Sequence, residues 1–155
     1  MSDLEGIPYL TGKDDCYGLM RKYFLKEYGL KLSNYARPFD FGRQGIDLIS
    51  ENISREGFEN VDVPLSMLEV GDGITFAITG SRIANHIAVY VGNNFVLHHL
   101  YKAKSCKENF SNMWKSHVLN VVRHPEVARQ NSLRVTPTLD ILSLLPPHVR
   151  AQFLT

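Results

Sequence analysis

The pattern of apolar and polar residues is most regular between residues 84 and 100. Two short runs, Ile87–Val91 and Phe95–Leu97, are rich in the β-branched and aromatic residues that favour strands. Between them lies the triplet Gly92–Asn94, whose residue types tolerate the positive φ of a tight turn. The pattern therefore predicts a β-hairpin.

The length of the turn decides which side chains of the hairpin share a face. A two-residue turn places His98 on the face of Ile87, whereas a three-residue turn places His98 opposite Ala88. We favour the three-residue turn, because it puts His86 and His98 together, close enough for their imidazoles to hydrogen-bond. The other face then holds the large apolar side chains Ile87, Val89, Val91, Phe95 and Leu97. We interpret the small, polar face with two histidines as a functional site.

An amphipathic helix is predicted between Asp15 and Gly29. Asp14 or Asp15 can cap its start, and Gly29 suits its end. The inward face follows i, i+3, i+4, i+7 spacing and comprises Cys16, Leu19, Met20, Tyr23 and Phe24. Cys16 therefore lies at the positive end of the helix dipole, which lowers the pKa of a thiol and favours the reactive thiolate.

The rest of the chain predicts an α+β domain followed by an appendage. We expect a second helix from Arg43 or Gln44 to Arg55, and strands from Ile74 to Ile78 and from His117 to Arg123. Helices that precede an antiparallel sheet indicate the α+β class. Residues 1–124 are interpreted as one domain, and residues 125–155 as a segment that packs on this domain or docks on a partner. We favour docking, because prolines isolate its apolar patch, which comprises Leu139, Ile141, Leu142, Leu144 and Leu145.

Composition and charge narrow the classes of partner. The chain has 155 residues, a hydrophobic content of 44% and a net charge of +1, which gives no case for a nucleic acid or an anionic membrane surface. No run reaches the roughly 18 apolar residues of a transmembrane helix. The first ten residues lack the basic and apolar regions of a secretory signal peptide. Two cysteines, Cys16 and Cys106, do not make a disulfide framework, which favours synthesis in a reducing compartment.

A cysteine at a helix start and two histidines on a hairpin predict nucleophilic catalysis. In such a site one histidine takes the thiol proton and a second polar group orients that histidine. The long separation in sequence does not count against this hypothesis, because such partners meet in the fold.

Four motifs in order resemble the NlpC-type (NlpC/p-sixty) cysteine peptidases, papain-like enzymes that cut the peptide stems of the bacterial cell wall. Residues 15–19, DCYGL, resemble the family's DCSGL box, and residues 6–12, GIPYLTG, resemble its G-x-P-Y segment. Residues 68–76, LEVGDGITF, resemble its L-x-P-G-D strand entry. Residues 86–98, HIAVYVGNNFVLH, resemble its hairpin, including the two terminal histidines.

The resemblance implies a papain-like fold, in which the helix that carries the cysteine packs on an antiparallel sheet. It implies Cys16 as the nucleophile, His86 as the base and His98 as the orienting residue. It also implies that the Tyr9 hydroxyl lies beside the nucleophile and helps to hold the oxyanion. The expected reaction is hydrolysis of peptidoglycan peptide stems at the γ-D-glutamyl to diaminopimelate bond, with neither a metal nor a cofactor.

Departures from the family pattern point to one branch. Tyr17 replaces Ser, Ala88 replaces Gly, and the loop between Tyr9 and Cys16 is short. These segments most resemble the versions found in phage tail tip assembly proteins of lambda-like siphophages. That likeness implies tail tip proteins as partners. It also implies synthesis in the host cytoplasm without a signal peptide and delivery to the host cell envelope by the virion tail.

Other interpretations compete with the nucleophile. Cys16 could be a buried structural thiol, or it could bind zinc with His86 and His98, with His99 or Cys106 as the fourth ligand. Otherwise we expect His99 to be structural and Cys106 to be a spectator. The alternative function is a structural or assembly protein of the tail tip with a vestigial site. An acyltransferase using the same thioester chemistry is a more distant alternative.

Overall fold

The structure is a computed structural model that describes residues 2–37, 47–134 and 144–153. Its helices are α1 (Cys16–Tyr28), α2 (Leu48–Arg55), α3 (Asn112–Lys115), α4 (Pro125–Arg134) and α6 (Pro147–Phe153). Its strands are β1 (Glu59–Val61), β2 (Gly73–Phe76), β3 (His86–Gly92), β4 (Phe95–His98), β5 (Cys106–Asn109) and β6 (Val118–Arg123). The strands form one antiparallel sheet in the order β1-β6-β2-β3-β4-β5. The α+β class is confirmed.

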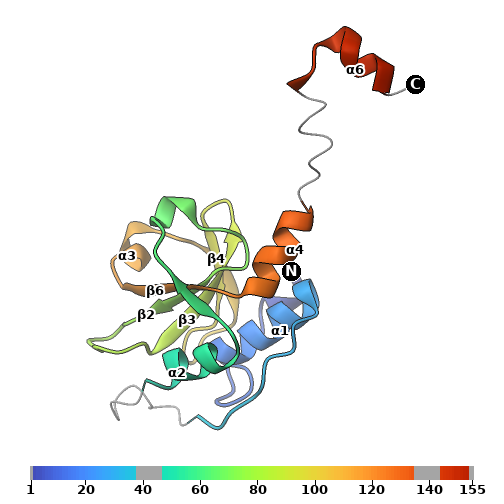
Figure 1. Ribbon diagram of the computed structural model, residues 1–155. Coiled ribbons are helices and arrows are strands. Elements are labelled where there is room, and N and C mark those ends of the chain that lie inside the picture. Colours follow the sequence, from blue (N-terminus) through green and yellow to red (C-terminus); the bar gives the residue numbers. More distant parts are fainter. Residues whose placement is uncertain (1, 38–46, 135–143, 154–155) are drawn as a thin grey trace.

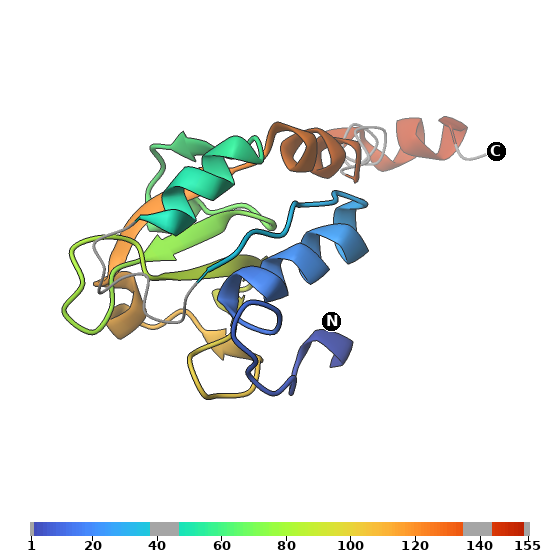
Figure 2. The ribbon, with the colours of Figure 1, turned by 90° about the horizontal axis from the view of Figure 1, so that it is seen from below.

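The sheet separates two apolar clusters. On one face, α1 and α2 pack over Ile87, Val89 and Leu97. On the other face, Trp114 of α3 packs against the alternate side chains of β2, β3 and β4. Figures 1 and 2 show α1 and α2 on one side of the sheet, and Figure 1 shows α3 on the other. The period-two alternation of the strands thus sends neighbouring residues into different clusters.

Helix α1 has the capping expected from its sequence. The Asp15 side chain accepts a hydrogen bond from the Gly18 amide, and Gly29 ends the helix at φ 63°. The predicted inward residues Leu19, Met20, Tyr23 and Phe24 are buried. Cys16 is therefore the first residue of the helix, on the side that faces the sheet.

The hairpin of β3 and β4 combines both registers considered for it. At the turn, Gly92 pairs with Phe95, and Asn93 and Asn94 adopt φ of 53° and 61°. A bulge at Val91 then shifts the pairing, so that Val89 faces Leu97, as the three-residue turn requires. The turn has two residues, and the bulge restores the predicted sorting of side chains between the faces.

Other elements differ from their predicted bounds. Helix α2 begins at Leu48, where Asp47 accepts a hydrogen bond from the Ser50 amide, and residues 43–46 lie outside the described residues. Ile49 and Ile53 face inward as predicted. Strands β1 and β5 and the short helix α3 have too few residues to give a periodic signal, and the sequence did not predict them.

The segment after His124 consists of a part that packs on the domain and a part for which no such packing is described. Helix α4 packs on the domain: Val127 is buried, and the side chains of Gln130 and Asn131 donate to the carbonyls of Tyr28 and Val70. Residues 135–143, which include most of the apolar patch, lie outside the described residues. In Figure 1, α6 lies apart from the sheet and from α1. Packing on the domain therefore accounts for residues 125–134, and docking by the remainder stays a prediction.

Removal of α4 is expected to destabilise the domain. Burial of one valine contributes about 1.5–3 kcal/mol, and Val127 is 1% exposed. A chain that ends at His124 should therefore unfold at a lower urea concentration than a chain that ends at Arg134. Equal unfolding midpoints for the two chains would show that α4 contributes nothing to stability.

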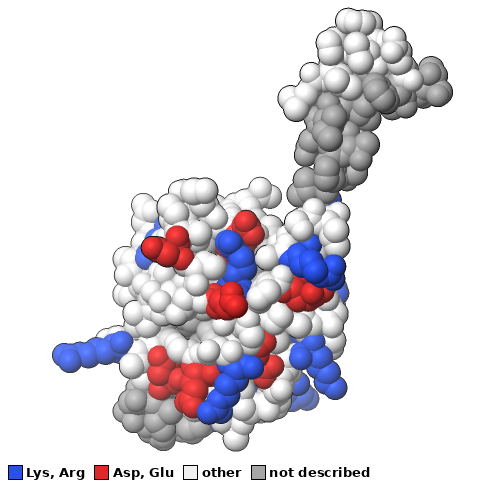
Figure 3. Space-filling model, in the orientation of Figure 1, with Lys and Arg blue, Asp and Glu red and all other residues white. Residues whose placement is uncertain are grey.

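Charges are mixed over the visible surface. Figure 3 shows acidic and basic side chains interspersed on the face drawn, with neither sign forming a continuous field there. None of the helices among the described residues is long and apolar enough to cross a membrane.

Candidate active site

Cys16 lies where α1 meets the start of β3. The backbone amide of Ile87, the residue after His86, hydrogen-bonds to the Cys16 sulfur. Burial nevertheless raises the pKa of the thiol to about 12, and the neighbouring Asp15 carboxylate adds to this rise. The predicted lowering of the pKa is therefore wrong. The helix start and the Ile87 amide do favour the thiolate, but exclusion from water outweighs them.

A buried ion pair holds the start of α1 in place. Arg37 donates two hydrogen bonds to Asp15, at 2.8 Å from Nε and 2.7 Å from Nη2, and both side chains are almost fully buried. The Gly12 and Gly18 amides also donate to this carboxylate. Burial acts to raise the pKa of Asp15, but these donors hold it below its usual value. Asp15 thus joins the loop before α1, the helix and the irregular segment that contains Arg37.

The DCYGL motif has a packing reason at Tyr17 and at Gly18. A Cβ atom on Gly18 would lie 1.8 Å from the Lys13 carbonyl oxygen, so the close approach of this loop requires glycine. Tyr17 is fully buried, and its hydroxyl donates to the Ser33 carbonyl at 2.8 Å. The replacement of the family's Ser by Tyr17 therefore changes the packing behind α1, below the Arg37 guanidinium.

The two hairpin histidines and a carboxylate form a series of close polar contacts. His86 Nε2 lies 3.0 Å from His98 Nδ1. His98 Nε2 in turn lies 2.7 Å from Glu108 Oε2 of β5. The predicted pairing of the histidines is confirmed by these contacts, and Glu108 was not predicted. Its strand is four residues long, and the sequence between Lys104 and Asn109 gives no periodic signal that marks it.

The surroundings of this series correct one expectation. The face that carries His86 and His98 is apolar, not small and polar. Trp114 packs against both imidazole rings, and Phe76 packs against that of His86. Burial lowers the pKa of His86 well below its usual value of 6.5 and lowers the pKa of His98 as well, although Glu108 opposes the shift of His98. Both imidazoles are therefore uncharged near neutral pH.

The series fixes the tautomers of both histidines. A ring nitrogen 2.7 Å from a carboxylate oxygen must carry a proton, since two lone pairs at that distance would repel each other. With its proton on Nε2, His98 offers Nδ1 as the acceptor, and His86 then donates from its own Nε2. The unprotonated atom of His86 is Nδ1, which is the atom left free to act as a base.

Tyr9 and His99 pack against each other. The Tyr9 ring meets the His99 ring edge-on at 5.4 Å. Burial raises the pKa of the Tyr9 hydroxyl, and the charge of Cys16 adds to the rise. His99 Nε2 lies 2.9 Å from the Ala103 carbonyl and donates to it. His99 is thus buried and tied to its own loop, as expected of a structural residue.

The structure does not bring together the residues that the sequence suggested as zinc ligands. Among the residues that the structure describes, three ligand atoms within 4.8 Å of one another belong to His98, Cys106 and Glu108. Cys16 is outside this group. Both cysteines are free thiols.

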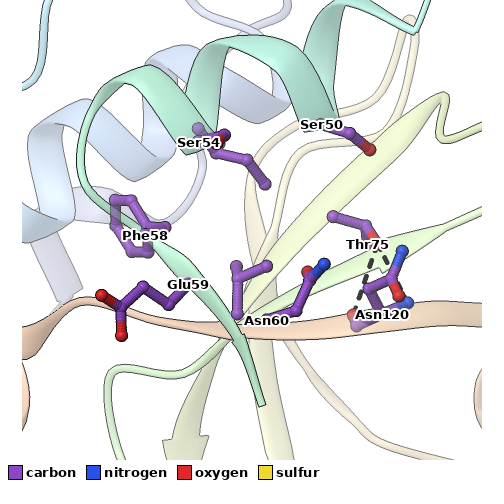
Figure 4. A pocket seen from close by; sticks show the side chains of 9 residues that line it. Ser50, Ser54, Phe58, Glu59, Asn60, Thr75 and Asn120 are labelled. Carbon is purple, nitrogen blue, oxygen red and sulfur yellow. Dashed lines mark hydrogen bonds between the residues drawn. The ribbon is translucent and has the colours of Figure 1, made fainter. Parts of the chain in front are cut away.

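A polar cavity lies one strand away from the thiol. Its volume is about 330 Å³, and Thr75 on its wall pairs across the sheet with Ile87. Figure 4 shows Ser50 and Ser54 of α2 above the cavity and Thr75 and Asn120 on the sheet below it. The cavity therefore offers hydroxyl and amide groups on the same face of the sheet as Cys16.

Acid is expected to destabilise the fold through its buried histidines. The pKa values of His86, His98 and His99 are all lowered, chiefly by burial, so the folded chain binds fewer protons than the unfolded chain below about pH 6.5. The free energy of unfolding should fall as the pH decreases from 7 to 5, by up to about 1.4 kcal/mol per pH unit for each histidine. Urea titrations should show a shallower fall in His86→Gln than in the parent. An equal slope in the two proteins would contradict this prediction.

Comparison with known proteins decides the family. The NlpC/P60 family model matches residues 6–123, which include the thiol, both histidines and Glu108. This chain belongs to the NlpC/P60 family. The sequence motifs named above therefore belong to one family pattern, as predicted.

Two curated relatives of this NlpC/P60 chain are both called tail tip assembly protein K. The one from Escherichia phage lambda is 32% identical over 125 residues, covering 76% of this chain and 60% of that protein. The one from Escherichia phage N15 is 26% identical over 129 residues, covering 82% of this chain and 51% of that protein. The chain thus spans little more than half the length of these relatives.

Solved structures of NlpC/P60 proteins confirm the fold. A protein of this family from Staphylococcus aureus gives a TM-score of 0.52 at 20% identity, over 78% of this chain and 37% of that one. An NlpC/P60 protein from Bacillus cereus gives 0.52 at 20% identity, over 77% of this chain and 36% of that one. NlpC1 from Trichomonas vaginalis gives 0.52 at 18% identity, over 77% of this chain and 39% of that one. The predicted papain-like, NlpC-type arrangement, with α1 ahead of the sheet, is correct.

Proposed function

We propose that this chain is a cysteine endopeptidase that hydrolyses the peptide stems of bacterial peptidoglycan. The bond proposed is that between γ-D-glutamate and diaminopimelate. The observation that carries the proposal is the series His86–His98–Glu108, whose first member directly precedes Ile87, the residue with its backbone amide at the Cys16 sulfur. Such a series fixes the base and stabilises its charged form, which a purely structural protein does not need.

The thiol and the base start uncharged, so proton transfer accompanies attack. His86 Nδ1 takes the proton as the Cys16 sulfur bonds to the carbonyl carbon, which overcomes the raised pKa of the thiol. The imidazolium that forms donates from Nε2 to His98, and Glu108 stabilises its charge through His98. His86 then protonates the leaving amine. Water, activated by His86, hydrolyses the thioester and regenerates the thiol.

Two donors are available for the oxyanion. The amide of Cys16 lies in the first turn of α1, where backbone N–H groups have no partner within the helix. The Tyr9 hydroxyl lies near enough to the thiol for its pKa to be raised by that charge. We assign these two groups to the oxyanion, and the cavity beside Thr75 to polar groups of the peptide stem.

The names of the two phage relatives support a place in the tail tip. We propose that the enzyme binds tail tip proteins, travels with the virion tail and acts in the host cell envelope. The same names also favour the second candidate, a tail tip assembly protein in which the site is dispensable. The two candidates differ in one measurable property, which is turnover of a peptide bond.

Incubation with defined muropeptides tests the proposal. Mass spectrometry should find the two fragments that result from cleavage at the γ-D-glutamyl to diaminopimelate bond. Stems that carry lysine in place of diaminopimelate provide a comparison for the chemical class of the substrate. If no stem is cut at high enzyme concentration and the protein still completes tail tips, the assembly role is the correct one.

The two histidines are expected to differ in their contribution to the rate. Loss of a general base costs about 10²–10⁴-fold in rate, so His86→Asn should lose nearly all activity. His98→Asn should retain measurable activity, because an amide can still accept the His86 hydrogen bond. Single-turnover assays of the two variants provide the comparison. The reverse order of activities would show that the roles are exchanged.

A further inference from the structure

The pairing of β4 and β5 brings three potential metal ligands together, one of which is His98. His98 lies directly opposite Cys106, and Glu108 is two residues further along β5 and therefore on the same face of the sheet. One ligand atom from each side chain lies within 4.8 Å of the other two. The proposed hydrolysis uses only two of the three residues, which leaves Cys106 without a role in it.

The contact between His98 and Glu108 resembles the contact between two ligands of one metal ion more than a hydrogen bond. Their atoms are 2.7 Å apart, yet neither His98 Nε2 nor Glu108 Oε2 has a hydrogen bond of acceptable angle. The His98 side chain is 1% exposed, so its Nε2 has no water to bond to instead. Ligands that share one cation point toward that cation and not along the line that joins them.

We propose that His98, Cys106 and Glu108 form an inhibitory binding site for Zn²⁺. Imidazole nitrogen, thiolate sulfur and carboxylate oxygen are the three ligand types that zinc prefers, and water can fill the fourth position. Zinc bonds of about 2.0–2.1 Å place two tetrahedral ligands about 3.3 Å apart. Glu108 must therefore move outward by a few tenths of an ångström, and its side chain, 43% exposed, is able to do so.

Zinc at this site reverses the tautomers that make His86 a base. The metal binds the lone pair of His98 Nε2, so the single proton of neutral His98 moves to Nδ1. His98 then donates to His86 Nε2, and the proton of His86 moves to Nδ1, the atom that must be free for catalysis. Both histidines stay neutral, and the one proton that leaves the protein comes from the Cys106 thiol. The ion thus inactivates the site without contact with Cys16.

Zinc binding is measured first, independently of turnover. The full chain, Cys16→Ala, Cys106→Ala and Lys107→Ala are titrated with ZnCl₂ in a competing chelator buffer, and the bound metal is counted. We expect one Zn²⁺ per chain in the parent, in Cys16→Ala and in Lys107→Ala, and a loss of about 10–100-fold or more in affinity in Cys106→Ala. Cobalt as a spectroscopic probe should show a thiolate-to-metal band that Cys106→Ala lacks and Cys16→Ala keeps.

Inhibition, unlike binding, rests on the proposed hydrolase function. Zinc should inhibit the parent at the concentration that fills the site, and Cys106→Ala should keep its activity there. Binding that disappears in Cys16→Ala but remains in Cys106→Ala would place the ion on the nucleophile and overturn the proposal. Zinc binding with the expected ligands in a protein that cuts no peptide would uphold the site and refute only the hydrolase function.

Discussion

Cys16→Ala is expected to abolish peptide hydrolysis while the domain stays folded. The substitution removes the only atom that can form the thioester in the proposed reaction, and no base can replace it. The sulfur is one small group at the start of α1, and the capping of that helix by Asp15 does not depend on it. The measurement is cleavage of a muropeptide that the parent cuts, followed over many half-lives, with circular dichroism to verify folding.

Cys106→Ala is the matched control for this experiment. It also removes one thiol, but from β5, and should leave the rate of hydrolysis in a zinc-free buffer close to that of the parent. Equal loss of activity in the two variants would mean that thiol removal acts through the fold. Hydrolysis by Cys16→Ala at the parental rate would exclude the cysteine mechanism altogether.

Arg37→Met should cause the largest loss of stability among substitutions outside the two apolar clusters. The change leaves the Asp15 carboxylate buried without its cation, and breaking a buried ion pair from one side costs about 3–5 kcal/mol. Urea denaturation at pH 7 measures this loss directly. Because Asp15 also caps α1, the variant should lose order at the start of that helix, next to Cys16.

An exposed pair provides the comparison for Arg37. Arg55 and Glu51 lie 2.6 Å apart on α2, with side-chain exposures of 70% and 54%. Such pairs contribute about 0.2–1 kcal/mol, so Arg55→Met should leave the free energy of unfolding almost unchanged. If Arg37→Met is equally mild, water reaches the Asp15 carboxylate and the ion pair does not organise the start of α1.

The sequence predicted those parts of the site that depend on local patterns. Helix α1 was predictable because its cap, its apolar spacing and its terminal glycine lie within fifteen residues. The pairing of His86 with His98 was predictable because a hairpin is local and a buried face fixes its register. The bulge at Val91 was missed because either turn length satisfied the pattern alone.

The parts that were missed depend on contacts between distant segments. Glu108 reaches His98 only because β5 pairs with β4, and four residues with one apolar side chain do not identify a strand. Arg37 reaches Asp15 across 22 positions, from a segment without regular structure. The pKa of Cys16 was predicted in the wrong direction for a related reason. A helix end is visible in a sequence, whereas the exclusion of water is a property of the packed molecule.

The outer side of β5 connects residues 5–7 to the contact between Glu108 and His98. There the Gly6 amide donates to the Ser105 carbonyl, the Ser105 amide donates to the Ile7 carbonyl, and the Lys107 amide donates to the Glu5 carboxylate. Segments held by few buried contacts open readily in native-state hydrogen exchange, well below the cost of global unfolding. When these hydrogen bonds open, β5 loses its outer support and Glu108 can leave His98 while α1 and the central strands stay intact. On warming, the contact between Glu108 and His98 should therefore be lost before the domain unfolds. Amide exchange at residues 105–108 would report the temperature at which β5 opens.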